Sequence, residues 1–273
     1  MNEIFRIKIK MVFLRKRNVM EKLLPRHNDI LKELNEKDHI LVQDLCEKFN
    51  VSSVTIRKDL NYLESLGLLF RNHGGASKQV RYAYEKNVDE KENINVEAKK
   101  NIAKGALSLI QENDCIILAS GTTMHYLARM LVNFGPLTVL TSSLRVAIEL
   151  CNNPNINIIQ LGGEVRKSST SIVGSISETI LKHFSCNKLF LGVDGIDMDF
   201  GISTSNAAEA HLNQLMIECS DKVVILADSS KLNKKGFGKI ADLDKIDFLI
   251  TDGDILDEDK NKLEEIGISV IVK

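Results

Sequence analysis

Small hydroxyl residues, glycines, aspartates and one lysine follow a series of short apolar runs, and these residue types could together bind a phosphorylated polyol. The candidates are Gly121, Thr122, Thr123, Thr141, Ser142, Ser143, Gly162, Gly163, Asp194, Asp197 and Lys231. Hydroxyls and backbone N–H groups at a helix start can hold an anion, and a lysine adds a point charge that suits phosphate. Aspartates accept hydrogen bonds from sugar hydroxyls. These residues predict an effector site for a phosphorylated sugar, without a metal or a cofactor.

Each piece of this pattern also has an ordinary structural explanation. A Gly-Thr-Thr sequence before a helix is a common N-cap, and an Asp-Gly pair is a common turn. A Gly-Gly pair can form a tight connection, and a lysine is usually a solvated surface residue. The prediction therefore depends on whether the residues fall on one edge of one sheet.

The apolar runs alternate with amphipathic stretches, and this order predicts an α/β fold with a mostly parallel, doubly wound sheet. The expected strands cover 115–119, 137–141, 156–161, 188–193, 222–227, 247–251 and 268–272. The expected helices cover 97–110, 123–132, 144–151, 175–184, 207–218 and 257–266. Ligands of such sheets bind beyond the carboxyl ends of the strands, where the candidate residues stand.

The first 80 residues carry a different pattern, which predicts a winged helix-turn-helix. Apolar spacing indicates helices over 26–36, 42–48 and 53–66, followed by a short hairpin within 68–75. Ser52 can cap the third helix, which buries either Val54 or Ile56 together with Leu60 and Leu63. Such a helix fits the DNA major groove. The alternatives are a three-helix bundle without a role at DNA and a protein-interaction module of the same shape.

The polar face of the third helix and the hairpin supply the candidate DNA contacts. On the helix these are Ser53, Thr55, Arg57, Lys58 and Asn61, and on the hairpin Arg71 and His73. Residues near the start of a recognition helix reach base edges, while arginine and lysine also neutralise phosphates.

Charge and composition agree with two soluble domains. Through Tyr82 the chain has 16 basic and 10 acidic residues, whereas the remainder has 20 and 27, so a basic head precedes an acidic body. A basic head favours a polyanionic partner. Five cysteines, without a CxxC pair, favour a reducing cytoplasm over a disulfide framework or a zinc site. No apolar stretch reaches the roughly 20 residues that a membrane span needs.

Two ordered sets of motifs resemble the DeoR family of bacterial transcriptional regulators. The first set is 51–60, with the sequence VSSVTIRKDL, and 71–76, with RNHGGA. The second set is 121–123, 161–163, 192–197, 201–204 and 227–231. The resemblance implies that Ser52, Ser53, Thr55, Arg57 and Lys58 face DNA, and that Asp59 is structural and pairs with a basic neighbour. It also implies a sensor domain similar in fold to ribose-5-phosphate isomerase, from which a phosphorylated sugar releases the repressor from operator DNA.

The resemblance divides the chain into four parts. We expect an N-terminal extension over 1–21, a winged helix-turn-helix over 22–77, a linker over 78–91 and a sugar-phosphate sensor over 92–273. A homodimer or homotetramer is expected, because symmetric operators match symmetric proteins. One departure is Ala119, where the family often has an aspartate, so one acceptor for effector hydroxyls is missing.

Two other functions remain open from the sequence. The sensor domain could only oligomerise, leaving a DNA-binding protein without an effector. The isomerase likeness also allows an enzyme in which Glu209 is a base and Lys231 stabilises charge. We expect no enzyme, because the Lys-Gly-Gly-Gly segment of the isomerases is replaced by 200–205, with the sequence FGISTS.

Overall fold

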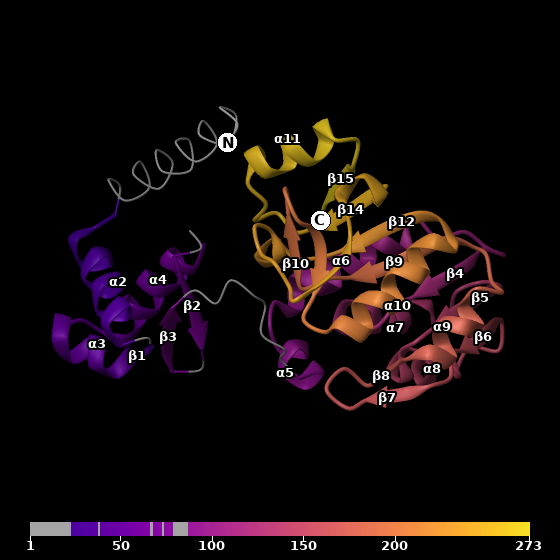
Figure 1. Ribbon diagram of the computed structural model, residues 1–273, viewed down its shortest axis with the longest axis horizontal. Helices are drawn as coiled ribbons and strands as arrows, with labels where there is room; N and C mark the ends of the chain where they lie inside the picture. The colour runs from indigo at the N-terminus through magenta and orange to yellow at the C-terminus, as the bar shows by residue number, and fades with distance from the viewer. Residues whose placement is uncertain (1–22, 38, 66–67, 73, 79–86) are drawn as a thin grey trace, which may run out of the picture. The chain divides into compact units, whose positions relative to one another are not determined.

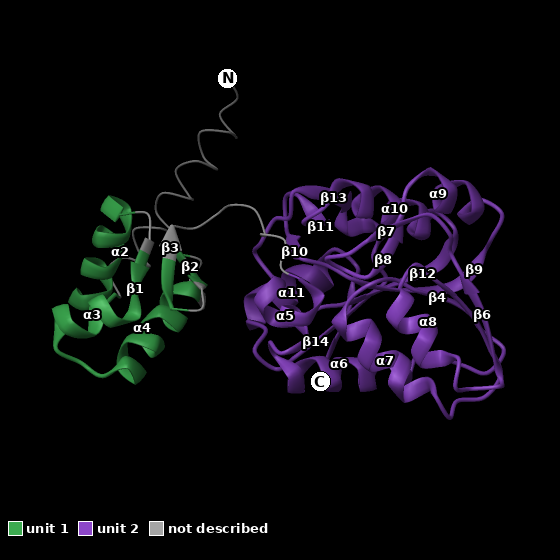
Figure 2. Ribbon diagram, turned by 90° about the horizontal axis from the view of Figure 1, so that it is seen from below, with its two compact units in different colours: residues 1–80 green, residues 81–273 purple. Residues whose placement is uncertain are grey.

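The computed structural model describes residues 23–37, 39–65, 68–72, 74–78 and 87–273 (Figure 1). The chain divides into two compact units, Met1–Val80 and Arg81–Lys273, shown in green and purple in Figure 2. The extension expected over 1–21 lies outside the described residues.

In its described residues, the first unit combines three helices with a small antiparallel sheet. Its helices are α2 (Pro25–Lys37), α3 (Val42–Phe49) and α4 (Ser53–Ser65), and its strands are β1 (His39–Leu41), β2 (Leu69–Asn72) and β3 (Gly75–Lys78). The strand order is β1-β3-β2. Strand β1, which lies between α2 and α3 in the chain, therefore pairs with β3 and extends the hairpin of β2 and β3. This arrangement confirms the winged helix-turn-helix. Sequence analysis missed β1 because three residues are too few to show a period of two.

A single apolar core holds these helices together. Ile30 of α2, Leu45 of α3, and Ile56 and Leu60 of α4 are fully buried within it. The turn between α3 and α4 passes through Asn50, whose φ of 51° places it in the left-handed region that asparagine tolerates. Because one side of α4 is buried in this core, the opposite side of the helix is exposed to solvent.

The second unit is built on a seven-stranded parallel sheet. Its strands are β4 (Cys115–Leu118), β5 (Leu137–Thr141), β6 (Ile156–Gln160), β9 (Cys186–Gly192), β12 (Ser220–Leu226), β14 (Phe248–Thr251) and β15 (Ser269–Val272). The order across the sheet is β15-β14-β12-β9-β4-β5-β6. From β4 the chain adds β5 and β6 toward one edge of the sheet. It then returns to the other side of β4 and adds β9, β12, β14 and β15 toward the opposite edge. This reversal between β4 and β9 is the topological switch point, where doubly wound sheets bind ligands.

Helices cover both faces of this sheet, as expected (Figure 2). One face packs against α6 (Val96–Leu107), α7 (Thr122–Leu131) and α8 (Leu144–Leu150), and the other against α9 (Ser175–Leu181), α10 (Ala207–Glu218) and α11 (Asp257–Glu265). Alternate strand residues point to opposite faces, so Ile116 and Leu118 join the first layer and Ile117 joins the second.

Three structural elements of the second unit were not predicted from the sequence. The connections contain a hairpin of β7 (Glu164–Arg166) and β8 (Ser171–Val173), and a sheet of β10 (Gly195–Asp197), β11 (Gly201–Thr204) and β13 (Gly238–Ala241). Helix α5 (Val88–Glu92) lies inside the segment expected to be a linker. The Val88 N–H donates to Ser168 O at 2.7 Å, so the second unit begins before residue 92. These elements have only three to five residues each, which is too short for a periodic signal.

Candidate nucleic-acid interface and effector site

The start of α4 presents most of the residues predicted to face DNA. Ser52, Ser53, Arg57 and Lys58 are exposed, and Thr55 is half-buried. The Thr55 N–H donates to Ser52 Oγ at 3.3 Å, which is the side-chain bond of an N-cap. The structure thus places these five residues on the first turns of one helix, and their contact with DNA stays a prediction.

A buried ion pair fixes α4 against α2. Arg26 Nε donates to Asp59 Oδ2 at 2.6 Å, and His27 Nε2 lies 3.2 Å from Asp59 Oδ1. Burial would raise the pKa of Asp59, but the hydrogen bonds with Arg26 and His27 outweigh burial and hold that pKa below its usual range. Asp59 therefore stays ionised and holds the two helices in a fixed orientation. This is the structural pairing expected of Asp59.

The hairpin is tied to the same helix. The Arg71 N–H donates to Glu64 Oε1 at 3.0 Å, and the Arg71 guanidinium donates to Asn61 Oδ1. Arg71 therefore lies next to the exposed face of α4, where its contact with DNA is still to be tested. His73, the other hairpin candidate, lies outside the described residues.

In the second unit, the carboxyl edge of the sheet gathers three carboxylates with cations around them. The first is Asp194, directly after β9 at the switch point. Its Oδ1 accepts from Lys91 Nζ at 2.7 Å, and its Oδ2 accepts from Ser205 N and Oγ at 3.1 and 2.9 Å. Burial alone would raise the pKa of Asp194, but the charges of Lys91 and Lys231 and these hydrogen bonds hold that pKa well below its usual range.

The second carboxylate, Glu209 of α10, connects the switch point to the β7–β8 hairpin. Its Oε1 accepts from Ser120 Oγ at 2.5 Å, and its Oε2 accepts from Arg166 Nη1 at 2.6 Å. Ser120 follows β4, so Glu209 lies beside the same edge as Asp194. Thr204 Oγ1 lies 3.3 Å from Asp194 Oδ2 and 3.4 Å from Glu209 Oε2, which joins the two carboxylates.

The third carboxylate, Asp228, follows β12 and is buried. It accepts from Asn95 Nδ2 at 3.1 Å and from Ser230 N at 3.1 Å. Close by, Lys99 Nζ donates to Ile94 O at 2.6 Å and to Lys91 O, so Lys99 holds the end of α5. Burial lowers the pKa of Lys99 to about 8, although the negative charge of Asp228 raises this pKa in part. The Lys231 N–H donates to Asp228 O at 2.9 Å, which places Lys231 at the same edge.

Several effector candidates already have structural roles at this edge. Thr141 Oγ1 donates to Leu118 O at 2.6 Å and is fully buried. Ser143 Oγ accepts from Val146 N at 3.3 Å and caps α8, while Ser142 O accepts from Ile172 N at 2.8 Å. Gly121, Thr122 and Thr123 begin α7 from a Gly121 φ of 132°. These residues shape the edge, and any contact with an effector stays a prediction.

Three other candidates belong to the small added elements or directly precede them. Asp197 belongs to β10, where it accepts from the N–H groups of Asp199 and Phe200 at 3.0 and 2.8 Å. This carboxylate closes the β10–β11 turn, and its contact with an effector stays a prediction. Gly163 has a φ of +145°, and a Cβ there would lie 2.7 Å from Val173 O, so the β7–β8 hairpin requires a glycine. Gly162 precedes the same hairpin and is exposed.

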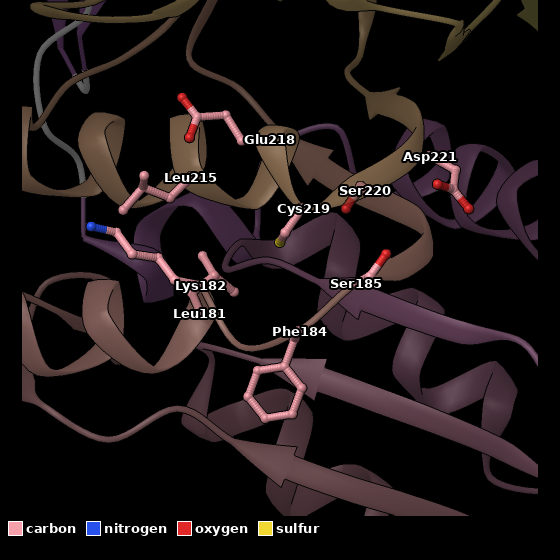
Figure 3. A pocket seen from close by; sticks show the side chains of 9 residues that line it. All are labelled: Leu181, Lys182, Phe184, Ser185, Leu215, Glu218, Cys219, Ser220 and Asp221. Carbon is pink, nitrogen blue, oxygen red and sulfur yellow. The ribbon is translucent and has the colours of Figure 1, made fainter.

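A surface pocket of about 330 Å³ lies away from this edge (Figure 3). It is lined by Leu181, Lys182, Phe184, Ser185, Leu215, Glu218, Cys219, Ser220 and Asp221. Cys186 begins β9 and Ser220 begins β12, so the pocket lies at the amino ends of these strands. The pocket therefore lies at the opposite ends of these strands from the cluster of charged groups.

Four members of the carboxyl-edge cluster were not among the predicted effector residues, namely Lys91, Lys99, Arg166 and Asp228, although Asp228 lies in the 227–231 motif. Lys91 and Arg166 stand in short elements that show no local signal. Asp228 directly follows a predicted strand, and that position could have included it. Within the described residues, no group of His, Cys, Asp or Glu side chains is placed to hold a metal ion. The same residues include no helix that is long and apolar enough to span a bilayer.

A winged helix followed by a doubly wound α/β unit with a charged switch point defines a two-part, DNA-binding regulatory protein. The DeoR-like helix-turn-helix domain matches residues 26–79, and the DeoR C-terminal sensor domain matches residues 94–253. The chain belongs to the DeoR family of transcriptional regulators. It is therefore a DNA-binding regulator and not an enzyme.

Relatives match almost the whole chain. An uncharacterised HTH-type transcriptional regulator, YulB, of Bacillus subtilis is 38% identical over 90% of this chain and 95% of its own length. A lactose phosphotransferase system repressor of Staphylococcus epidermidis is 33% identical over 88% of this chain and 95% of its own length. An L-fucose operon activator of Haemophilus influenzae is 32% identical over 89% of this chain and 97% of its own length.

Solved structures give a more distant match. Ribose 5-phosphate isomerase A from Methanocaldococcus jannaschii is 18% identical, covers 51% of this chain and 56% of its own, and has a TM-score of 0.39. A likeness at this level carries no statement about activity.

Proposed function

We propose that this protein represses genes of carbohydrate metabolism in the cytoplasm, and that a phosphorylated sugar bound at the carboxyl edge of the second unit releases it from operator DNA. The observation that carries the proposal is the cluster of Asp194, Glu209 and Asp228 with Lys91, Lys99, Lys231 and Arg166. The Staphylococcus epidermidis relative is named as a lactose phosphotransferase system repressor, which supports repression as the direction of control.

The residue types of the cluster suit both ends of such an effector. Ionised carboxylates accept hydrogen bonds from sugar hydroxyls, and lysine or arginine binds phosphate. The pKa of Asp194 is below its usual range, so this acceptor is available throughout the neutral region. Arg166 is held by Glu209 at 2.6 Å, and a guanidinium fixed in this way is suited to bind two oxygens of a phosphate group.

The ion pair of Lys91 with Asp194 offers a route from effector to DNA. Lys91 belongs to α5, the first described helix after the winged helix-turn-helix unit. An effector hydroxyl on Asp194 or an effector phosphate on Lys91 competes with this pair and so loosens α5, which Arg145 also holds through Asp89 and Glu92. An effector that favours the loosened arrangement by about 1–3 kcal/mol weakens operator affinity roughly 5–150-fold.

We propose further that the protein acts as a homodimer or homotetramer, since a two-fold operator is matched by a two-fold protein. Analytical ultracentrifugation with and without operator DNA tests this part. A monomer under both conditions would contradict it.

Fluorescence anisotropy tests the main proposal. Labelled DNA from the region upstream of the protein's own gene is titrated at several salt concentrations, with a scrambled duplex as control, and a panel of phosphorylated sugars is then added. We expect specific, salt-sensitive binding that one phosphorylated sugar relieves. Specific binding that no phosphorylated sugar alters would favour the second candidate, a sensor unit that only oligomerises.

A further inference from the structure

Val54 is a large apolar side chain that projects into solvent from the first turn of the recognition helix. Its exposed fraction is 59%, whereas Ile56, the other apolar residue of that turn, is fully buried. The structure thereby decides between the two core residues that the sequence left open. Because Ile56 occupies the core position, Val54 adds nothing to the packing of this unit.

The neighbours of Val54 are the residues expected to meet DNA. Arg57, Lys58 and Asn61 stand three, four and seven positions after Val54, and all three are exposed. This spacing places the four side chains on one stripe of the helix. The buried stripe on the other side consists of Ile56, Leu60 and Leu63. Val54 is therefore the apolar, N-terminal member of the DNA-facing stripe.

The major groove offers one apolar feature that such a side chain can contact. Among the base edges in this groove, only thymine carries a methyl group, at C5, while the others present hydrogen-bond donors and acceptors. Residues in the N-terminal part of a recognition helix are the ones that reach base edges. A valine side chain has no donor or acceptor, so its favourable contact in the groove is with that methyl group.

We propose that Val54 contacts a thymine methyl group and so makes one position of each operator half-site specific for thymine. The inference rests on the proposed function, because it requires that α4 enters the major groove. Arg57 and Lys58 on the same stripe supply the charge that holds the helix against the phosphates.

The test compares the full-length protein with its Val54→Ala variant. Each protein selects duplexes from a random library, and the selected sites are sequenced. We expect one thymine per half-site to be required by the wild-type protein and to lose its preference with Val54→Ala. Alanine has a higher helix propensity than valine, so the variant retains α4, which circular dichroism verifies.

Replacing that thymine with deoxyuridine removes only the methyl group and isolates the contact. The wild-type affinity should fall roughly fourfold per half-site, the value of one buried methyl group. Val54→Ala should bind the thymine duplex with similarly reduced affinity and show no further loss with deoxyuridine. Val54→Ile should keep the sensitivity to deoxyuridine. Leu24→Ala is the matched control, because Leu24 is an exposed apolar residue of the same unit outside α4.

Two results would overturn the inference, and they differ from each other. If the wild-type protein selects specific sites but deoxyuridine weakens it and Val54→Ala equally at every thymine, Val54 does not read a methyl group, and a protein partner for this side chain becomes the alternative. If the wild-type protein selects no specific duplex, the proposed DNA-binding function fails together with the inference.

Discussion

Lys91 Nζ lies 2.7 Å from Asp194 Oδ1, and this ion pair joins helix α5 to the switch point of the central sheet. The two residues are 103 positions apart in the sequence. The side chains are 28% and 11% exposed, so solvent screens the pair only in part. Lys99 holds the same end of α5 through bonds to the carbonyl groups of Lys91 and Ile94. The start of the second unit is thus bound to the carboxylate at which we propose the effector acts.

Lys91→Met should weaken operator binding in the absence of any effector. The substitution keeps most of the aliphatic stem but removes the cation that ties α5 to Asp194. Affinity should move toward the value of the effector-bound protein, a decrease within roughly 5–150-fold, measured by anisotropy on operator DNA. Lys100→Met is the control, since Lys100 forms a surface pair with Glu97 and lies away from Asp194. Unchanged operator affinity in Lys91→Met would show that the pair has no part in coupling.

Arg57→Ala should weaken operator binding and leave effector binding unaltered. Arg57 is exposed on the stripe of α4 that we propose faces DNA, so its loss should remove a phosphate or base contact worth about 1–3 kcal/mol. Anisotropy measures the DNA affinity, and calorimetry with the identified sugar phosphate measures the effector affinity. Arg129→Ala, a half-exposed arginine of the second unit, should leave operator affinity intact. A wild-type DNA affinity for Arg57→Ala would refute the assignment of α4 as the recognition helix.

Lys231→Ala should abolish induction while operator binding persists. The charge of Lys231 acts on Asp194 and on Lys99, so its ammonium group is placed to meet an anionic effector. The measurement is the effector concentration that releases half of the bound operator duplex, which should rise more than roughly tenfold for one lost charge-assisted bond. Lys245→Ala, at an exposed position beside Asp244, should behave as the wild-type protein. A normal response in Lys231→Ala would identify Lys231 as an ordinary surface residue.

Lys99 should add a distinct pH dependence to the stability of the second unit. Its pKa is about 8 in the folded protein against 10.5 in the unfolded chain, because burial disfavours the charged form. Between these values the unfolded chain binds more protons, so the Lys99 contribution to the free energy of unfolding rises with pH, by about 1 kcal/mol per pH unit at most. Well below pH 8, where Lys99 is protonated in both states, this contribution is constant.

Urea unfolding of the wild-type protein and Lys99→Met at pH 7.5, 8.5 and 9.5 measures this dependence. The difference in free energy between them should increase in favour of the wild type as the pH rises. The lost bonds to Lys91 O and Ile94 O add a constant offset and leave the slope unchanged. Lys100→Met, on the neighbouring exposed residue, should not show this rising difference. A difference that stays level across the range would contradict a depressed pKa for Lys99.

Local patterns determined much of the architecture. Helix α10 was predicted at Ala207–Glu218 and strand β5 at Leu137–Thr141, with the bounds that the structure has. Both have enough residues for their apolar positions to repeat with the period of a helix or a strand, and this repetition is a property of the sequence alone. The order of the elements likewise determined the doubly wound sheet, since its parallel connections allow few topologies.

Only the tertiary structure decided which side chains meet. Ile56 and Val54 are both apolar and lie two positions apart in one turn, and only the position of the core buries the first and exposes the second. Lys91 pairs with Asp194 and Arg166 with Glu209 across 103 and 43 positions, through α5 and β7, which are too short to be periodic. The sequence determined the helices and strands because their apolar residues repeat at a regular local spacing. Contacts between distant residues arise from packing, and packing produces no regular spacing in the sequence.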